Sequence, residues 1–242
     1  MNLSPGDNER RSQERHGSRS TGTGASCTCR LCGLSETALL YRGDRRSHNR
    51  EFHHCPRCDL VFVPDRFLLN PAEERRRYLL HENDPDDEDY RTFLSRLLNQ
   101  VTPLLEPEAE GLDYGCGDPP VLVMMLRESG FRVEGWDLYF SPDAELLARS
   151  YDFLTCSETA EHFRRPLIEF ERFDRLLSPG GVLGVMTQML DDRSEFADWH
   201  YHFDETHICF FSPRTMRWIA ERFGWSVSFP RESVTIFRQA QG

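Results

Sequence analysis

The sequence contains no lysine, because the 29 residues counted as Lys or Arg are all arginines. This absence excludes mechanisms that need a lysine amine, namely a Schiff base, a GK[ST] phosphate-binding loop and the strand lysine of protein kinases. Long apolar runs are also missing, and none approaches the ~20 residues of a transmembrane helix. Residues 1–20 lack the apolar stretch of a secretory signal, so we expect a cytoplasmic protein.

The 242 residues suit one domain with a small appendage or one enlarged domain. Charge is unevenly spread along them. Residues 1–60 carry 10 arginines against 7 acidic residues, whereas residues 61–242 carry 19 against 33. An acidic main body is poorly suited to a phosphate backbone, which binds dense cationic surface. The composition therefore favours a small-molecule or protein partner, and leaves nucleic acid only to the N-terminal part.

Four of the eight cysteines form two CxxC pairs with 22 residues between them. In a reducing compartment this spacing is typical of a metal site rather than of disulfides. The predicted ligands of a Zn²⁺ ion are Cys29, Cys32, Cys55 and Cys58, with Cys27, His53 and His54 as substitutes. A site closed by four thiolates has no open position for water, so its role would be structural. A redox role is the alternative, although neither pair sits at the strand-to-helix junction of a larger sheet.

Composition divides the chain into four predicted parts. Residues 1–26 are polar and should be a disordered, solvated tail; a basic arm that binds nucleic acid is the alternative. Residues 27–65 form the zinc ribbon, in which the stretch between the two CxxC pairs supplies a hairpin. Residues 66–109 form a charged helical connector or lid, and its acidic residues 84–89 precede a helix that stops before Pro103.

Residues 110–242 alternate between strand and helix patterns. Strands are expected at 110–115, 131–137, 151–158 and 182–190, with a turn at 178–181 between the last two. Two closing strands follow, with Pro230 between them, and helices are expected at 119–129, 166–177 and 212–223. Such alternation predicts an α/β fold with a mainly parallel sheet covered on both faces.

The first of these strands leads into two glycines at a strand-to-helix turn. Gly115 and Gly117 let the chain turn tightly and let a ligand approach the backbone. Asp137 ends the next strand, where a carboxylate can bind ribose hydroxyls. Pro120 stands where a dinucleotide-binding motif needs its third glycine. The pattern thus predicts a ribose-bearing cofactor without a pyrophosphate, and an NAD-dependent oxidoreductase is a weaker alternative.

These segments resemble the class I S-adenosylmethionine (SAM)-dependent methyltransferases over about residues 110–240. The similar motifs are GLDYGCGDP, the strand end GWD, YDFLTCSETAEHF and the turn and strand LLSPGGVLGVMT. The resemblance implies a Rossmann-like sheet that ends in an antiparallel strand pair. With the predicted ribbon, the layout resembles a bacterial group of zinc-ribbon methyltransferases. Sugar C-methyltransferases carry a comparable ribbon on a longer chain, and one group of rRNA guanine methyltransferases also has an N-terminal zinc site.

The resemblance also implies a set of cofactor contacts. Asp113, Gly115 and Gly117 would line the methionine half of SAM, Asp137 would hold the ribose and Leu138 would pack on the adenine. Ser157 and Glu158 would face the amino-acid end of the cofactor or the acceptor. Only 14 residues separate Asp137 from Asp152, so the third strand of the family and its helix must be abbreviated.

An aromatic and histidine-rich segment, residues 199–207, follows the strand at 182–190. In the family this region often forms the acceptor pocket. His200 and His207 are the preferred bases and His162 is the third candidate, with Asp204 as an orienting group. The alternative is that these rings pack under a loop and the histidines cap backbone groups. We also expect four residues to cover the site from the N-terminal side: His81, Glu82, Asn83 and Tyr90.

The function expected from the sequence is in-line methyl transfer from SAM to a small-molecule acceptor, with oxygen, nitrogen and carbon all open as the accepting atom. A zinc-ribbon RNA methyltransferase and a non-catalytic methyltransferase-like adaptor are the alternatives. The acidic body argues against nucleic acid, and nothing points to a membrane partner. No pattern specifies an oligomeric state.

Overall fold

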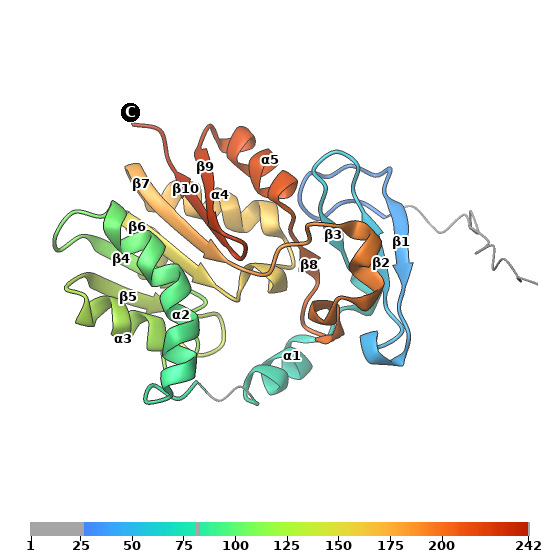
Figure 1. The fold of residues 1–242 in the computed structure, drawn as a ribbon, viewed down its shortest axis with the longest axis horizontal. Coiled ribbons are helices and arrows are strands. Elements are labelled where there is room, and N and C mark those ends of the chain that lie inside the picture. Colours follow the sequence, from blue (N-terminus) through green and yellow to red (C-terminus); the bar gives the residue numbers. More distant parts are fainter. Residues whose placement is uncertain (1–26, 81–82, 242) are drawn as a thin grey trace, which may run out of the picture.

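The computed structural model describes residues 27–80 and 83–241 (Figure 1). The predicted disordered tail, His81 and Glu82 therefore lie outside the described residues. The larger part of the fold is one six-stranded sheet with the strand order β5-β4-β6-β7-β10-β9. Its strands are β4 (Glu110–Tyr114), β5 (Arg132–Trp136), β6 (Tyr151–Ser157), β7 (Leu177–Met186), β9 (Ser226–Arg231) and β10 (Val234–Arg238). Strands β4 to β7 are parallel, and β10 is antiparallel to both of its neighbours. The predicted α/β fold class is confirmed.

Helices cover both faces of this sheet (Figure 1). On one face, α2 (Glu88–Val101) and α3 (Val121–Glu128) enclose an aliphatic core with Phe153 and Val182. On the other face, α4 (Pro166–Leu176) and α5 (Pro213–Phe223) enclose an aromatic core with Leu154 and Leu183. Neighbouring residues of β6 and β7 alternate between the two cores, as a pleated sheet with two buried faces requires.

The helices begin where local chemistry satisfies their first backbone N–H groups. Asp87, one of the acidic residues at 84–89, caps α2. Ser212 caps α5 through a capping box with Thr215. Helix α1 (Pro71–Tyr78) lies inside the predicted charged connector and starts with a capping box of Asn70 and Glu73. This helix has little apolar surface, so hydrophobic periodicity did not reveal it.

The larger sheet differs from the sequence prediction in β7 and β9 and agrees with it at the third strand. Residues 178–181 belong to β7 instead of forming a turn, because Gly180 and Gly181 pair with residues 239–240. Pro230 lies within β9, an edge strand whose outer side needs no N–H donor. The abbreviated third strand is confirmed: between Asp137 and β6 the described backbone forms an isolated bridge from Asp137 to Ser141 and a short 3-10 helix at Leu146–Ala148, but no strand.

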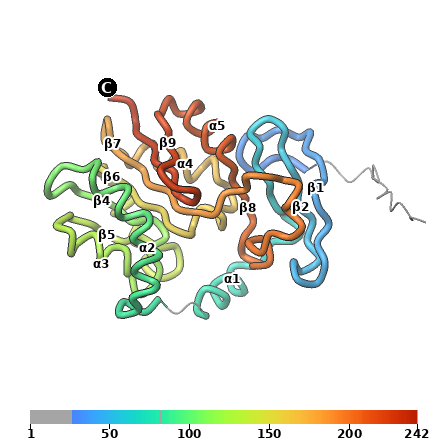
Figure 2. The backbone as a smooth tube through the Cα atoms, viewed as in Figure 1, coloured from blue at the N-terminus to red at the C-terminus, as the bar shows by residue number. Residues whose placement is uncertain are grey.

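The smaller sheet joins the N-terminal region to the larger part of the molecule (Figure 2). Its order is β1 (Ala38–Arg42), β2 (Glu51–His54), β3 (Val61–Phe62) and β8 (Cys209–Phe210), and all pairs are antiparallel. Strand β8 comes from the segment between β7 and α5. Residues of this sheet, including Phe52 and Phe62, share one buried cluster with the aromatic core. The predicted ribbon is therefore packed into the main body.

Arg50 ties the hairpin of this sheet to the segment that precedes β8. Its side chain is buried, and it donates hydrogen bonds of 2.6–3.1 Å to the backbone carbonyls of Ser47, His202, Asp204, Glu205 and His207. One planar guanidinium with five N–H donors can satisfy this many acceptors.

Among the described residues, no helix is long and apolar enough to cross a membrane.

We expect Arg50→Ala to lower the free energy of unfolding by about 3 kcal/mol or more, because several buried carbonyls lose their donor. Urea denaturation measures this change. Arg45→Ala is the matched control, since Arg45 is exposed on the turn of the same hairpin and its loss should cost within ~0.5 kcal/mol. Equal stabilities of the two variants would contradict the role given to Arg50.

Candidate functional site

The tips of β4 and β5 lie side by side and are joined by a hydrogen bond. The backbone N–H of Gly117 donates to Oδ2 of Asp137 at 3.2 Å. Gly115 and Gly117 both have positive φ angles, of 82° and 66°. A Cβ atom at Gly115 would lie 2.3 Å from the side chain of Thr159, so glycine is required there. The tight turn predicted from the glycines is present at this position.

Asp137 is held by backbone donors on both strand tips. Besides Gly117, the N–H groups of Tyr139 and Phe140 donate to its Oδ1 at 2.8 and 3.1 Å. A carboxylate has about four acceptor positions, so Oδ2 retains capacity for one more donor. Asp137 and the exposed Leu138 both line the cavity described below.

Asp113 lies deeper, near the end of β4. Its side chain is buried and accepts a hydrogen bond of 2.7 Å from the Thr155 hydroxyl. Burial raises the pKa of Asp113 to about 7; the Thr155 bond opposes this shift, and the nearby negative charge of Asp137 adds to it. The protonation of this carboxyl group therefore changes near neutral pH.

The end of β6 contributes Ser157 and Glu158 to the same region. Glu158 has φ of +45°, an unusual backbone angle for a residue other than glycine. Burial and the neighbouring Glu161 raise the pKa of Glu158 to about 9. The buried hydroxyl oxygen of Ser157 has no hydrogen-bond partner among the described residues. An orphaned buried hydroxyl next to the glycine turn is consistent with a polar ligand at this point.

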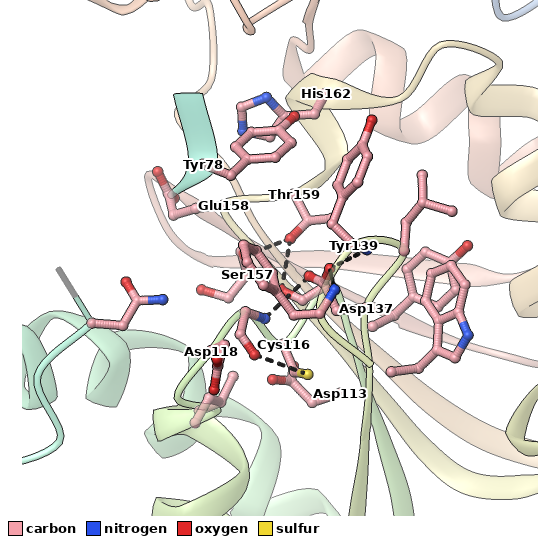
Figure 3. Close-up of a pocket in the computed structure, with 18 of the residues that line it drawn as sticks. Tyr78, Asp113, Cys116, Asp118, Asp137, Tyr139, Ser157, Glu158, Thr159 and His162 are labelled. Carbon is pink, nitrogen blue, oxygen red and sulfur yellow. Dashed lines mark hydrogen bonds between the residues drawn. The ribbon is translucent and has the colours of Figure 1, made fainter. Parts of the chain in front are cut away.

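These residues line one cavity of about 510 Å³ (Figure 3), a size typical of small-molecule sites. The strand tips and Asp113 form one end. Tyr78, His162 and His207 contribute to its other side, where the Tyr78 ring lies 5.3 Å from the His162 ring. Six carboxyl groups line the cavity, from Glu74, Asp113, Asp118, Asp137, Glu158 and Glu161. Its described lining therefore contains more acidic than basic side chains, and no arginine is among them.

Of the three histidines predicted as bases, two lie in the cavity and one lies outside it. His162 and His207 line the cavity, with ring centroids 4.9 Å apart. His200, a preferred candidate, is exposed and is absent from the cavity lining, because the short helix at His200–Phe203 turns its side chain outward. His202 follows the alternative prediction of packing: it is fully buried and stacks on Phe196 at 4.8 Å.

Helix α1 supplies cavity residues that the sequence analysis missed. Glu74 accepts hydrogen bonds from Tyr78 and Tyr139 at 3.0 and 3.1 Å and from Arg164 at 2.8 Å. The capping pattern of Asn70 and Glu73 was the available signal for this helix. Of the four residues predicted to cover the site, Asn83 and Tyr90 line the cavity, and the other two lie outside the described residues.

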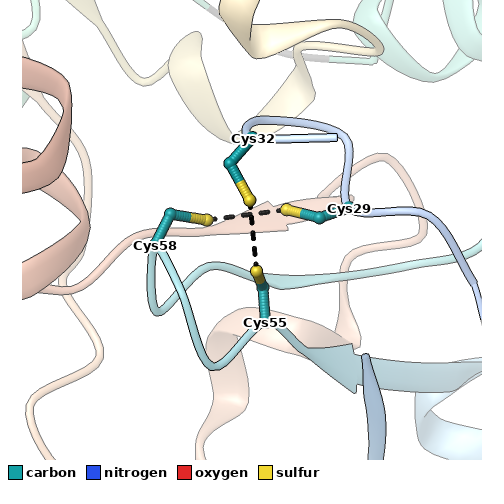
Figure 4. A group of neighbouring side chains, drawn as sticks. All are labelled: Cys29, Cys32, Cys55 and Cys58. Atoms are coloured by element: carbon teal, nitrogen blue, oxygen red, sulfur yellow. Dashed lines mark hydrogen bonds between the residues drawn. The ribbon is translucent and has the colours of Figure 1, made fainter. Parts of the chain in front are cut away.

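The four predicted zinc ligands converge at a second place, within the N-terminal region (Figure 4). The sulfur atoms of Cys29 and Cys58 are 3.5 Å apart, those of Cys32 and Cys55 are 3.3 Å apart, and all four lie within 4.8 Å of one another. Four sulfurs placed ~2.3 Å from a tetrahedral centre would be separated by roughly 3.8 Å. The cluster therefore has the donor set and the spacing for Zn²⁺, and Cys27, His53 and His54 are outside it.

The two CxxC turns repeat the same backbone pattern. Cys29 N–H donates to Leu34 and Cys55 N–H donates to Leu60, at 2.8 and 2.9 Å. Gly33 and Asp59 occupy the same position in the two turns, both with positive φ. Asp59 also accepts a hydrogen bond of 2.6 Å from Ser212, the capping residue of α5. The second turn is thereby attached to the main body.

The sheet order, with a parallel core and a C-terminal antiparallel pair, is that of a Rossmann-like methyltransferase fold. A family model described as a methyltransferase domain matches residues 87–228, well over half of the chain. The protein therefore belongs to the SAM-dependent methyltransferases.

Solved structures with a similar fold come from diverse organisms. An O-methyltransferase family protein from Burkholderia thailandensis is 16% identical over 70% of this chain, with a TM-score of 0.48, and the match spans 63% of that protein, less than two thirds of its length. A possible histamine N-methyltransferase from Thermotoga maritima is 15% identical, with coverages of 70% and 99% and a TM-score of 0.44. Magnesium protoporphyrin IX methyltransferase from Synechocystis PCC 6803, with bound SAM, is 15% identical, with coverages of 73% and 94% and a TM-score of 0.43. No curated protein sequence matches the chain.

We expect the purified chain to carry about one zinc ion, measured by elemental analysis. Removing it with a chelator should loosen β3 and, because β3 pairs with β8, should also increase amide exchange at Cys209 and Phe210. Strands β4 and β6 are the internal control and should keep their protection. Unchanged exchange at β8 after complete zinc removal would contradict the coupling.

Asp113 should make stability depend on pH. Its pKa in the folded chain, about 7, lies above the ordinary value, so the folded state binds the proton more tightly and loses this stabilisation as pH rises toward 7. Between pH 5 and pH 8 the parent chain should lose ~2–3 kcal/mol more of its unfolding free energy than Asp113→Asn. Parallel pH profiles of parent and variant in urea denaturation would contradict this assignment.

Proposed function

We propose that this enzyme transfers the methyl group of SAM to a small-molecule acceptor in the cavity described above. The observation that carries the proposal is the continuity of that cavity. One end is formed by the glycine turn and Asp137, and the same space extends to Tyr78, His162 and His207. A donor and an acceptor can therefore occupy one continuous cavity.

The residues at the tips of β4 and β5 are the groups that would contact the cofactor. Asp137 has acceptor capacity left for a ribose hydroxyl, and its orientation is set by three backbone N–H groups. Leu138 presents an apolar surface for the adenine. Asp113, Gly115 and Gly117 line the space for the methionine half, where the orphaned Ser157 hydroxyl offers a further hydrogen bond.

The acidic lining supports a neutral or cationic acceptor. The described lining contains no arginine and so offers no guanidinium to a nucleic acid phosphate backbone, which binds to cationic surfaces. The enclosing side chains from α1 and from the segment before β8 also limit the size of an acceptor. These features favour a small molecule over RNA.

When bound, SAM supplies a methyl group already activated by its sulfonium sulfur. The chain mainly has to align the two reacting atoms and exclude water. Helix α1 closes one side through the Glu74 contacts to Tyr78 and Tyr139. The imidazoles of His162 and His207 line the acceptor side of the cavity and are the candidate bases. His200 does not line the cavity and is not a candidate.

We further infer that the four thiolates hold Zn²⁺ and that residues 27–65 act as a structural ribbon. Its task is to hold the segment before β8, which carries His207. The shared sheet and the Arg50 bonds support this role. Residues 66–109 would then be the lid, because α1 and the start of α2 line the cavity.

Calorimetry of the zinc-loaded chain with SAM and with S-adenosylhomocysteine tests the cofactor assignment. We expect saturable binding, weakened about 10- to 100-fold in Asp137→Ala, because hydrogen bonds to charged groups contribute ~1.5–3 kcal/mol. Asp143→Ala is the control, since Asp143 is exposed after the same strand and does not line the cavity.

Two other results would overturn the proposal. Binding without turnover on any offered acceptor would favour the adaptor, and an NAD cofactor identified by mass spectrometry of the purified chain would favour the oxidoreductase. Saturable binding that is equal in the parent chain and in Asp137→Ala would show that the ribose assignment is wrong.

A further inference from the structure

Three side chains with metal-binding atoms meet at the acceptor side of the cavity. Glu161 and His162 lie in the short helix after β6 (Ala160–His162), and His207 comes from the segment before β8. One ligand atom from each lies within 4.8 Å of the other two. All three residues line the cavity, and Figure 3 shows the His162 ring next to Tyr78 at its edge.

The backbone sets the orientation of both imidazoles. Nδ1 of His162 lies 3.0 Å from the carbonyl oxygen of Thr206, and Nδ1 of His207 lies 2.7 Å from that of Tyr201. A carbonyl oxygen only accepts hydrogen bonds, so each Nδ1 carries the proton. In a neutral ring, Nε2 then has a free electron pair. Metal-binding histidines in proteins are oriented by contacts of this kind.

One oxygen of the buried Glu161 carboxylate lacks a hydrogen-bond donor among the described residues. Its side chain is fully buried, and the Tyr201 hydroxyl donates to Oε1. Oε2 has no hydrogen-bond partner among the described residues. A buried carboxylate oxygen without a partner is costly, and a cation removes that cost. The absence of arginine from the described cavity lining leaves this position open to a cation from solution.

We propose that Glu161, His162 and His207 bind a divalent first-row transition-metal ion at the acceptor side of the cavity. Two imidazole nitrogens and one carboxylate oxygen suit Mn²⁺, Fe²⁺, Co²⁺ or Zn²⁺. The site differs from the cysteine cluster because three protein ligands leave coordination positions open to the cavity.

The open position gives the metal a role toward the acceptor, and this part rests on the proposed function. An acceptor hydroxyl bound there loses its proton to water more easily, because the positive ion stabilises the oxygen anion. That oxygen then bonds to the methyl carbon as the carbon–sulfur bond breaks, and the sulfur leaves as the neutral thioether. The ion, rather than a free imidazole, thus promotes deprotonation of the acceptor hydroxyl. A site of this kind selects acceptors that are methylated on oxygen.

Titration of the zinc-loaded full chain with Mn²⁺, followed by electron paramagnetic resonance, tests the site without SAM or acceptor. Mn²⁺ is at the weak end of the affinity order and does not displace zinc from thiolates. We expect one saturable Mn²⁺ per chain. His207→Ala and Glu161→Gln should weaken it at least about tenfold, whereas His200→Ala, which changes an exposed histidine of the same segment, should bind as the parent chain does.

Zinc content and S-adenosylhomocysteine affinity report whether each variant is folded, and His162→Ala replaces any variant that fails these checks. A folded chain that binds neither Mn²⁺ nor Co²⁺ saturably overturns the metal site, as does equal binding by the parent and His207→Ala. Loss of cofactor binding with intact Mn²⁺ binding would instead contradict the proposed function, so the two failures are distinguishable.

Discussion

The hydrogen bond between Gly117 N–H and the Asp137 carboxylate is the contact around which the site is built. It joins the tips of two adjacent parallel strands, and so places a backbone turn and a carboxylate at one end of a cavity. Because Gly115 has no Cβ atom, the turn can approach the side chain of Thr159 closely. Together with the parallel pairing of β4 and β5, this contact keeps the turn and Asp137 on one surface. The methyltransferase assignment agrees with this geometry.

The N-terminal region has a closer relation to the cavity than its separate motifs suggest. Its sheet is completed by β8, and Arg50 binds the backbone of the segment that carries His207. The two CxxC turns are thus connected through this sheet to a segment that lines the cavity. Such an arrangement lets a small module, too small for a core of its own, rigidify a loop of the larger domain.

Much of this could be predicted from the sequence because the signals are local. The CxxC spacing places thiolates on tight turns, and the glycine pair followed by Asp137 marks two strand ends, so both clusters were found. Helix α1 was missed because its contacts are polar and it lacks an apolar stripe. His200 was ranked beside His207 because histidines seven residues apart in an irregular segment carry no signal of which one faces inward. Arg50 gave no signal, since four of its five partners are backbone carbonyls more than 150 residues away.

The sequence by itself determined the class of fold, the four-cysteine cluster and the cofactor-side strand ends, since each depends on residues close together in the chain. The tertiary structure alone decided which histidines meet, that Glu161 is buried with an unpaired oxygen, and that the ribbon shares a sheet with β8. These features arise when segments far apart in the chain pack together. Burial and the directions of side chains are then set by all neighbours at once, and a linear pattern does not encode them.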